Sequence, residues 1–352
     1  MTHARTKRPV EFYQALPKVE LHRHLEGSVR VETLLDIGQD HGLIRNKETK
    51  TLRPLVQIGK DEPYTFENFL SKFSTLRSFY RSPDVIGRIT REAIEDAAKD
   101  NIRYLELRFT PVALSKAEGF PLDKVIDWVI AGVKEGEDIY GVKTGLIASI
   151  NRHESVDLAK QIVQLAIDRK QQGIVGLDLA GNEAEFSARP FAGILNEAQQ
   201  DGLKVTVHAG EWSGASNVVE AIQEVGARRI GHGVRVVEDK RAMALARREG
   251  VVFEVCITSN YQSGVVSRLD QHPYPRMLDA GLKTTLNTDD PSISDITLSQ
   301  EYRLACERLG IPLSVLRKQI LIAAQAAFLP DIAKQALIEQ LEKELDKKIP
   351  QV

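Results

Sequence analysis

Residues 19–27 have the sequence Val-Glu-Leu-His-Arg-His-Leu-Glu-Gly, and this stretch decides which α/β fold the sequence predicts. It begins as a short β-strand, and two histidines stand where that strand ends. An open, doubly wound sheet would carry a glycine-rich, phosphate-binding turn after its first strand. Because His22 and His24 occupy the place of that turn, the stretch favours a closed barrel of parallel strands over the open sheet.

The rest of the chain repeats short β-branched runs between longer amphipathic stretches. Eight such runs indicate an α/β fold of the (β/α)8 TIM-barrel type, with additional helices near the barrel mouth and at the C-terminus. The length of 352 residues suits a barrel of ~250 residues with insertions. The expected strands are 19–24, 103–109, 144–150, 174–179, 204–208, 229–231, 251–256 and 284–287, and the expected helices include 123–140, 156–170, 191–201, 240–248 and 332–348.

We expect one domain over residues 1–352, with a flexible tail over 1–9. Residues 46–80 interrupt the barrel pattern as an insertion, whose first part, 46–64, is polar and rich in turn-forming residues. An apolar stripe with the spacing of one helix face follows it. The stripe consists of Phe66, Phe69, Leu70 and Phe73. It has two interpretations: a helix face packed on the barrel, or a lid over the barrel mouth.

Composition argues against several classes of partner. The 47 basic residues nearly balance the 49 acidic ones, so charge gives no sign of a nucleic-acid partner. No apolar run approaches the ~20 residues of a membrane span, and the longest, 320–330, is expected to form a packed helix. Residues 1–9 lack the features of a secretory signal. Cys256 and Cys306 are too few for a disulfide framework, and we expect a cytoplasmic location.

Four polar clusters follow the expected strands one, five, six and eight. Their residues are His22 with His24, His208 with Glu211, His232 between two glycines, and Asp289 with Asp290. Each alone has an ordinary structural explanation, such as a strand-ending histidine, a solvated glutamate or a helix-capping aspartate. A barrel, however, brings the carboxyl ends of its strands to one mouth. Three histidines and one aspartate then form a zinc shell with room for water.

Six short motifs resemble the ordered motifs of the adenosine deaminase family. They are His-Arg-His at 22–24, Asn-Arg-His at 151–153, Asp-Leu-Ala-Gly-Asn-Glu at 178–183, His-Ala-Gly-Glu at 208–211, Gly-His-Gly at 231–233 and Asn-Thr-Asp-Asp-Pro at 287–291. The resemblance covers residues 16–309, and the order, the spacing and the strand context of the motifs agree. His153 is expected at the barrel rim, with a supporting or structural role.

The resemblance implies a zinc-dependent hydrolase that converts adenosine, and 2′-deoxyadenosine, to the inosine nucleoside and ammonia. It implies one zinc ion per chain, bound by His22, His24, His208 and Asp289. Zinc would lower the pKa of a bound water from ~15.7 towards ~7. Glu211 would donate a proton to purine N1, and His232 would accept the proton of the water, with Asp289 orienting it. Asp178 stands where relatives with two metals often have a modified lysine, which favours one metal.

The resemblance also implies a small purine nucleoside as the substrate. Asp290 would bind purine N7, and the Gly181 N–H would bind N3. Glu26 stands where adenosine deaminases commonly have an aspartate that contacts the ribose, and residues 256–260, Cys-Ile-Thr-Ser-Asn, differ from the animal enzymes. A 5′-modified adenosine, such as aminodeoxyfutalosine, and free adenine therefore stay open as alternatives. The motifs at 178–181 and 231–233 favour a nucleoside over free adenine.

Two other functions belong to different classes from a purine deaminase. A metal-dependent amidase, esterase or lactonase could use a related barrel, but a purine deaminase needs both an acid at N1 and a partner at N7. Glu211 and the pair Asp289–Asp290 provide these groups. A barrel retained only for binding would be expected to lack at least one ligand or acid, and none is missing from the motifs.

Overall fold

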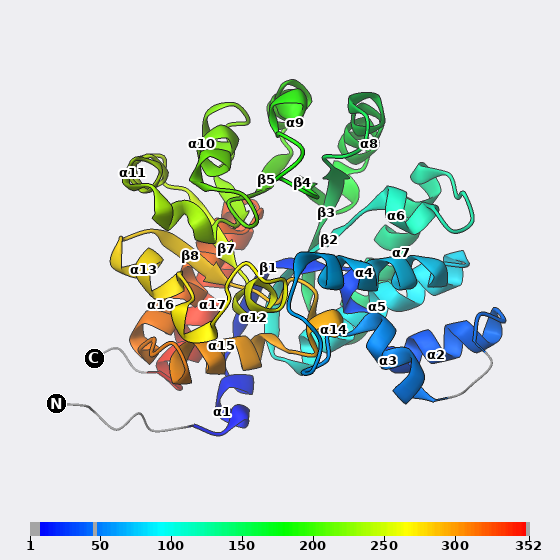
Figure 1. The fold of residues 1–352 in the computed structure, drawn as a ribbon, viewed down its shortest axis with the longest axis horizontal. Helices are drawn as coiled ribbons and strands as arrows, with labels where there is room; N and C mark the ends of the chain where they lie inside the picture. Colours follow the sequence, from blue (N-terminus) through cyan, green and yellow to red (C-terminus); the bar gives the residue numbers. More distant parts are fainter. Residues whose placement is uncertain (1–7, 45–47, 350–352) are drawn as a thin grey trace.

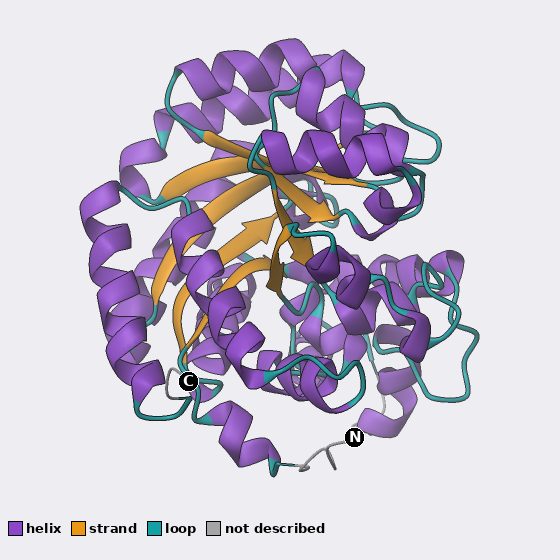
Figure 2. Ribbon diagram, turned by 90° about the vertical axis from the view of Figure 1, so that its left-hand side faces the viewer, coloured by secondary structure: helices purple, strands orange, loops and turns teal. Residues whose placement is uncertain are grey.

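The computed structural model describes residues 8–44 and 48–349. Eight parallel strands form one sheet in the order β1 to β8, and the sheet curls into a barrel that helices surround (Figures 1 and 2). The strands are β1 (Lys18–His24), β2 (Ile102–Phe109), β3 (Lys143–Asn151), β4 (Ile174–Ala180), β5 (Lys204–Ala209), β6 (Arg229–His232), β7 (Val252–Val255) and β8 (Lys283–Leu286). The (β/α)8 barrel predicted from the sequence is confirmed.

The loop after β8 closes the barrel. Arg23 in β1 forms an isolated parallel bridge with Asp289. The His24 N–H donates to the Asp289 carbonyl at 2.8 Å, and the Asp289 N–H donates to the His22 carbonyl at 2.9 Å. The backbone of this loop therefore completes the ring of strands at the barrel mouth.

Helices follow the strands around the outside of the barrel (Figure 2). The α-helices are α1 (Val10–Gln14), α2 (Val31–Asp40), α3 (Thr49–Val56), α4 (Phe66–Leu76), α5 (Pro83–Lys99), α6 (Pro111–Ser115), α7 (Leu122–Tyr140), α8 (Val156–Asp168), α9 (Ala192–Gln200), α10 (Ala215–Gln223), α11 (Lys240–Arg248), α12 (Ile257–Gln262), α13 (Tyr274–Asp279), α14 (Pro291–Ser294), α15 (Leu298–Glu307), α16 (Leu313–Ala326) and α17 (Asp331–Asp346). Short 3-10 helices are η1 (Glu26–Ser28), η2 (Arg77–Phe79), η3 (Lys170–Gln172), η4 (Arg189–Phe191), η5 (Val234–Glu238) and η6 (Leu269–Gln271). Among the described helices, none is long and apolar enough to span a membrane.

Two expectations about helices were wrong in part. The helix expected over 320–330 ends at Ala326, because the Phe328 N–H donates to the buried Glu106 carboxylate and Pro330 restricts the backbone before it. The polar segment 46–64 contains α3, which buries Leu52 and Val56, and residues 45–47 lie outside the described part. Residues 1–7 of the expected tail also lie outside it, and α1 begins at Val10.

A network of buried charges fills the barrel beneath its mouth. Arg229 donates to Glu106 and to Glu254 over 2.6 Å each. Arg108 donates to Glu254 over 2.7 Å and lies 3.3 Å from Asp178. These side chains are almost completely buried, so each charge depends on its partners. Two carboxylates of this network also contact histidines at the mouth: Glu254 contacts His22, and Asp178 contacts His208.

Candidate active site

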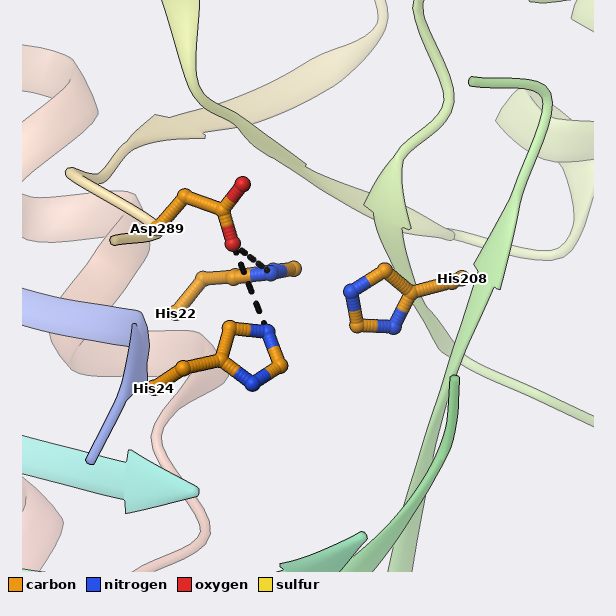
Figure 3. Close-up of side chains that lie close together, drawn as sticks. All are labelled: His22, His24, His208 and Asp289. Atoms are coloured by element: carbon orange, nitrogen blue, oxygen red, sulfur yellow. Dashed lines mark ion pairs between the residues drawn. The ribbon is translucent and has the colours of Figure 1, made fainter. Parts of the chain in front are cut away.

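The four expected metal ligands meet at the barrel mouth. One ligand atom from each of His22, His24, His208 and Asp289 lies within 4.8 Å of the others. Asp289 Oδ1 is 3.1 Å from Nε2 of His22 and 3.3 Å from Nε2 of His24. His208 approaches from the opposite side, on β5 (Figure 3). The i, i+2 pair on β1 therefore faces the barrel interior, together with a histidine from the far side.

Buried carboxylates orient two of these imidazoles. His22 Nδ1 lies 2.9 Å from Glu254 Oε2, and His208 Nδ1 lies 2.9 Å from Asp178 Oδ1. Burial alone would raise the pKa of Asp178, but His208 and Arg108 lower it below its usual range. Such carboxylate–histidine pairs fix the other ring nitrogen as a metal ligand. Asp178 belongs to the motif at 178–183, but neither its contact with His208 nor the role of Glu254 could be predicted from the sequence.

The donor set fits a zinc ion. Three imidazole nitrogens and one carboxylate oxygen match the nitrogen and oxygen ligands of catalytic zinc sites. His22 Nε2 is buried and makes no hydrogen bond with the described residues, although Asp289 Oδ1 is 3.1 Å away. Gly231 lets β6 approach, because a Cβ there would lie 2.9 Å from His22 Cε1 and 3.2 Å from His208 Cγ.

Two further groups could transfer protons beside the ligands. His232 Nε2 lies 3.7 Å from Glu211 Oε1 and 3.8 Å from Asp289 Oδ2. Burial, with the nearby Asp289 and Glu183 carboxylates, raises the pKa of Glu211 well above its usual value. Burial lowers the pKa of His232 well below its usual value, although Asp289 opposes the shift. These shifts favour the protonated form of Glu211 and the neutral form of His232.

Glu183 holds the turn that carries Glu211. Its Oε1 accepts hydrogen bonds from the backbone N–H groups of Glu211 at 2.6 Å, Trp212 at 2.8 Å and Ser213 at 3.1 Å. Its Oε2 accepts the Gly210 N–H at 2.8 Å. The motif at 178–183 includes Glu183, but no role for this residue could be predicted from the sequence. Its function depends on the fold, which brings the loop after β4 against the turn after β5.

A polar relay supports His232. Its Nδ1 lies 3.1 Å from Nδ2 of Asn260, and Oδ1 of Asn260 lies 3.4 Å from Nε2 of His272. His272 is buried, and burial lowers its pKa to about 3. The neighbouring Ser259 donates to Asp289 Oδ2 at 2.7 Å. The departure at 256–260 therefore contributes directly to the site.

A cavity of about 200 Å³ opens above the four ligands. Glu26, Gly181 and Asp290, the expected substrate contacts, all line it. Asp290 Oδ1 is buried and makes no hydrogen bond within the described residues. Burial, with Asp289 and Glu26, raises the pKa of Asp290 well above its usual value.

The insertion supplies part of the cavity wall. Phe69, Leu70 and Phe73 of α4 line the cavity, and Figure 1 shows α4 in front of the first strands. Both interpretations of the apolar stripe are therefore compatible with its position, because the helix lies over the mouth. His153 also lines the cavity, with its side chain half exposed, and it is not among the residues around the metal ligands.

The adenosine deaminase family model matches residues 17–344 of the chain. The chain is 37% identical to the adenosine deaminase of Klebsiella pneumoniae strain 342 over 330 residues, which cover 94% of this chain and 98% of that protein. It is also 37% identical to the adenosine deaminase of Aliivibrio fischeri strain ATCC 700601 / ES114 over 329 residues, 93% of this chain and 98% of that one.

Solved structures share the fold over nearly the whole chain. An adenine deaminase from Arthrobacter aurescens superposes with a TM-score of 0.86 at 25% identity, covering 94% of this chain and 99% of that one. An amidohydrolase from Burkholderia ambifaria with bound zinc has a TM-score of 0.86 at 28% identity, with 98% and 96% coverage. The N6-methyl-AMP deaminase of Arabidopsis thaliana has a TM-score of 0.83 at 28% identity, with 95% and 98% coverage. The chain belongs to the adenosine deaminase family.

Proposed function

We propose that the protein hydrolyses adenosine and 2′-deoxyadenosine to the corresponding inosine nucleoside and ammonia. The observation that carries this proposal is the meeting of three imidazoles and a carboxylate with a buried acid, Glu211, and a neutral base, His232, at one cavity. The adenosine deaminases of Klebsiella and Aliivibrio support the choice of reaction. Both cysteines are free thiols, which agrees with the cytoplasmic location we propose.

The metal we propose is one zinc ion per chain. His22, His24, His208 and Asp289 would hold it. Bound zinc would supply a nucleophile at neutral pH by lowering the pKa of water to about 7. The zinc in the amidohydrolase from Burkholderia supports the choice of ion.

The chain's own residues would then move two protons. His232 would accept the proton of the attacking water, because burial keeps its imidazole neutral. Glu211 would donate a proton to purine N1, because burial and neighbouring carboxylates raise the pKa of its carboxyl group. Protonation of N1 makes C6 electrophilic. Glu211 would therefore activate the purine, and His232 would activate the attacking water. Asp289 would orient the water through Oδ2, which Ser259 fixes from behind.

The substrate contacts follow from unsatisfied groups in the cavity. Burial and the neighbouring carboxylates raise the pKa of Asp290, and in its protonated form it would donate a hydrogen bond to the acceptor N7. The backbone of Gly181 would face N3, and its φ of +94° favours a glycine at this position. Glu26 Oε2 would accept a hydrogen bond from a ribose hydroxyl, because this oxygen is buried and makes no hydrogen bond within the described residues.

Two alternatives share the chemistry and differ in substrate. The adenine deaminase of Arthrobacter and the N6-methyl-AMP deaminase of Arabidopsis have the same fold. Free adenine and a 5′-modified adenosine are therefore the alternative substrates. The enclosed carboxylate of Glu26, which lines the same cavity, favours a nucleoside over free adenine because it offers an acceptor for a sugar hydroxyl.

The test measures adenosine turnover by the zinc-loaded enzyme, by the enzyme after its metal has been removed, and by the enzyme after zinc has been added back. We expect equimolar inosine and ammonia from the zinc-loaded protein, loss of both after chelation, and recovery with zinc. Ammonia release that is independent of metal, or hydrolysis of amide or lactone substrates without action on adenosine, would contradict the proposal.

A further inference from the structure

Arg77 lines the substrate cavity, and its side chain has no hydrogen-bond partner among the described residues. It is the first residue of η2, directly after α4. Its Nε atom is enclosed and makes no hydrogen bond, and no hydrogen bond or ion pair joins its guanidinium group to any residue of 8–44 or 48–349. Arg81, four residues later, instead pairs with Glu118 at 2.9 Å. The five donors of this permanently charged group therefore have no hydrogen-bond acceptor among the described residues.

The surroundings place Arg77 near the sugar side of the cavity. Its segment packs against η1, because the Tyr80 hydroxyl lies 3.5 Å from the Glu26 carbonyl oxygen. Glu26 lines the same cavity, and its Oε1 accepts the Thr110 N–H at 2.6 Å. Among the described residues, no hydrogen bond or ion pair joins Glu26 to Arg77; burial raises the pKa of Glu26 to about 7, and the charge of Arg77 is one of the influences that oppose this shift. The Glu26 carboxylate and the Arg77 guanidinium group therefore present a separate acceptor and donor to a ligand.

We propose that Arg77 is a specificity-determining residue that binds an anionic group on the 5′ carbon of the substrate's ribose. The inference rests on the proposed function, because Glu26 is the residue that places the ribose at this end. A neutral hydroxyl needs only Glu26, whereas an unpaired guanidinium group in a partly enclosed site is best stabilised by an anion. Nε of Arg77 is enclosed without a hydrogen bond to the described residues, and the residue lines the cavity.

Two anions have the chemistry that Arg77 would recognise. A phosphate and a carboxylate both accept two parallel N–H bonds from a guanidinium group. The Glu26 carboxylate would repel either anion at close range, so the anion would have to approach Arg77 on its Nη side. The competing explanation is that Arg77 only balances the charge of Glu26. In that case its loss would weaken neutral and anionic nucleosides equally.

The experiment compares the affinities of neutral and anionic nucleosides by titration calorimetry with the zinc-loaded full chain. The ligands are inosine, inosine 5′-monophosphate and the 5′-carboxylate derivative of inosine. At least one anionic compound should bind more tightly than inosine, and the preferred one shows which anion Arg77 recognises. In Arg77→Met the preference should fall about 10- to 100-fold. Arg77→Lys should retain part of it, and the matched control Arg81→Met should retain all of it.

Two results would overturn the inference: equal affinity for inosine and both anions, or a preference that survives in Arg77→Met. Arg77→Gln gives the same comparison if the methionine variant does not fold. The proposed deaminase function and the role of Arg77 are refuted by different results. Ammonia release from adenosine without any anion preference refutes only the role of Arg77. An Arg77-dependent preference in a protein that releases no ammonia refutes only the deaminase proposal.

Discussion

Asp289 contacts both the other proposed metal ligands and a residue that we propose transfers protons. Its Oδ1 faces His22 and His24, and its Oδ2 accepts from Ser259 and lies 3.8 Å from His232. Its backbone has a left-handed φ of 66°, which is uncommon for a residue other than glycine. Strain of this kind costs of order 1–3 kcal/mol, and the hydrogen bonds that close the barrel hold the residue in place.

The ligand assignment predicts which histidines hold the metal. His22→Ala and His208→Ala should each lose most of the bound zinc, because each removes one of four convergent donor atoms. His153→Ala is the matched control, since His153 lines the cavity and is not among the clustered ligands. Elemental analysis of the purified proteins measures the metal. Full zinc content in His22→Ala and His208→Ala would show that the ion binds elsewhere.

Removal of the acid should separate catalysis from metal binding. Glu211→Gln should retain the zinc and lose about 10²-fold or more of kcat, because the amide cannot protonate N1. Glu185→Gln is a suitable control, because Glu185 is an exposed carboxylate in the preceding loop. Steady-state kinetics on adenosine, with zinc content measured in parallel, provides the test. A near-normal kcat in Glu211→Gln would remove this residue from the mechanism.

At the scale of elements, α4 and the residues before it form contacts across the barrel mouth. The ring of Phe66 meets the edge of Trp212 at 4.2 Å between centroids, and Tyr64 meets Tyr261 at 5.0 Å. Trp212 directly follows the acid Glu211. The helix therefore covers the cavity from above and contacts the turn that carries the acid. We propose that this segment works as a lid.

The lid proposal predicts a change in kinetics. Phe66→Ala should change kcat and KM for adenosine together, since the ring anchors α4 to the turn after β5. Leu55→Ala is the control, because Leu55 belongs to the same insertion but is exposed and does not line the cavity. Unchanged kcat and KM in Phe66→Ala, at normal thermal stability, would favour a purely structural role for the helix.

Local sequence patterns were enough to predict the strands. Each expected strand overlaps an observed one, because a short β-branched run between helical stretches has few alternatives. The expected metal ligands converge because they occupy strand ends, which any barrel brings together. Glu183, Glu254 and Arg77 could not be assigned in this way. Their roles depend on contacts with distant segments, and their local sequence resembles that of ordinary charged residues.

At the scale of the molecule, the barrel buries many ionisable groups, and this couples stability to pH. Glu301 in α15 is fully buried and accepts the Ile257 N–H at 2.9 Å and the Thr258 N–H at 3.3 Å. Burial raises its pKa from 4.5 to about 7, although these hydrogen bonds oppose the shift. The folded state therefore holds this proton more tightly than the unfolded state. The stabilisation is complete below pH 4.5 and is lost as the pH rises to about 7.

Glu301→Gln should remove this pH dependence. Relative to the variant, the wild-type free energy of unfolding should fall by up to about 3 kcal/mol over that interval, which is the free energy equivalent of the pKa shift. Urea unfolding at several pH values between 4.5 and 8 measures it. Parallel curves for the two proteins would mean that Glu301 does not gain a proton on folding.

The most direct test of the central claim is the ratio of kcat/KM for adenosine to kcat/KM for adenine with zinc-loaded enzyme. A site that hydrogen-bonds sugar hydroxyls leaves polar groups unpaired when the sugar is missing, and rejection can reach ~10⁴-fold. Glu26 is such a group, with a buried Oε2 that makes no hydrogen bond within the described residues. We predict that adenosine is preferred by several orders of magnitude. An equal or higher kcat/KM for adenine would contradict the nucleoside assignment.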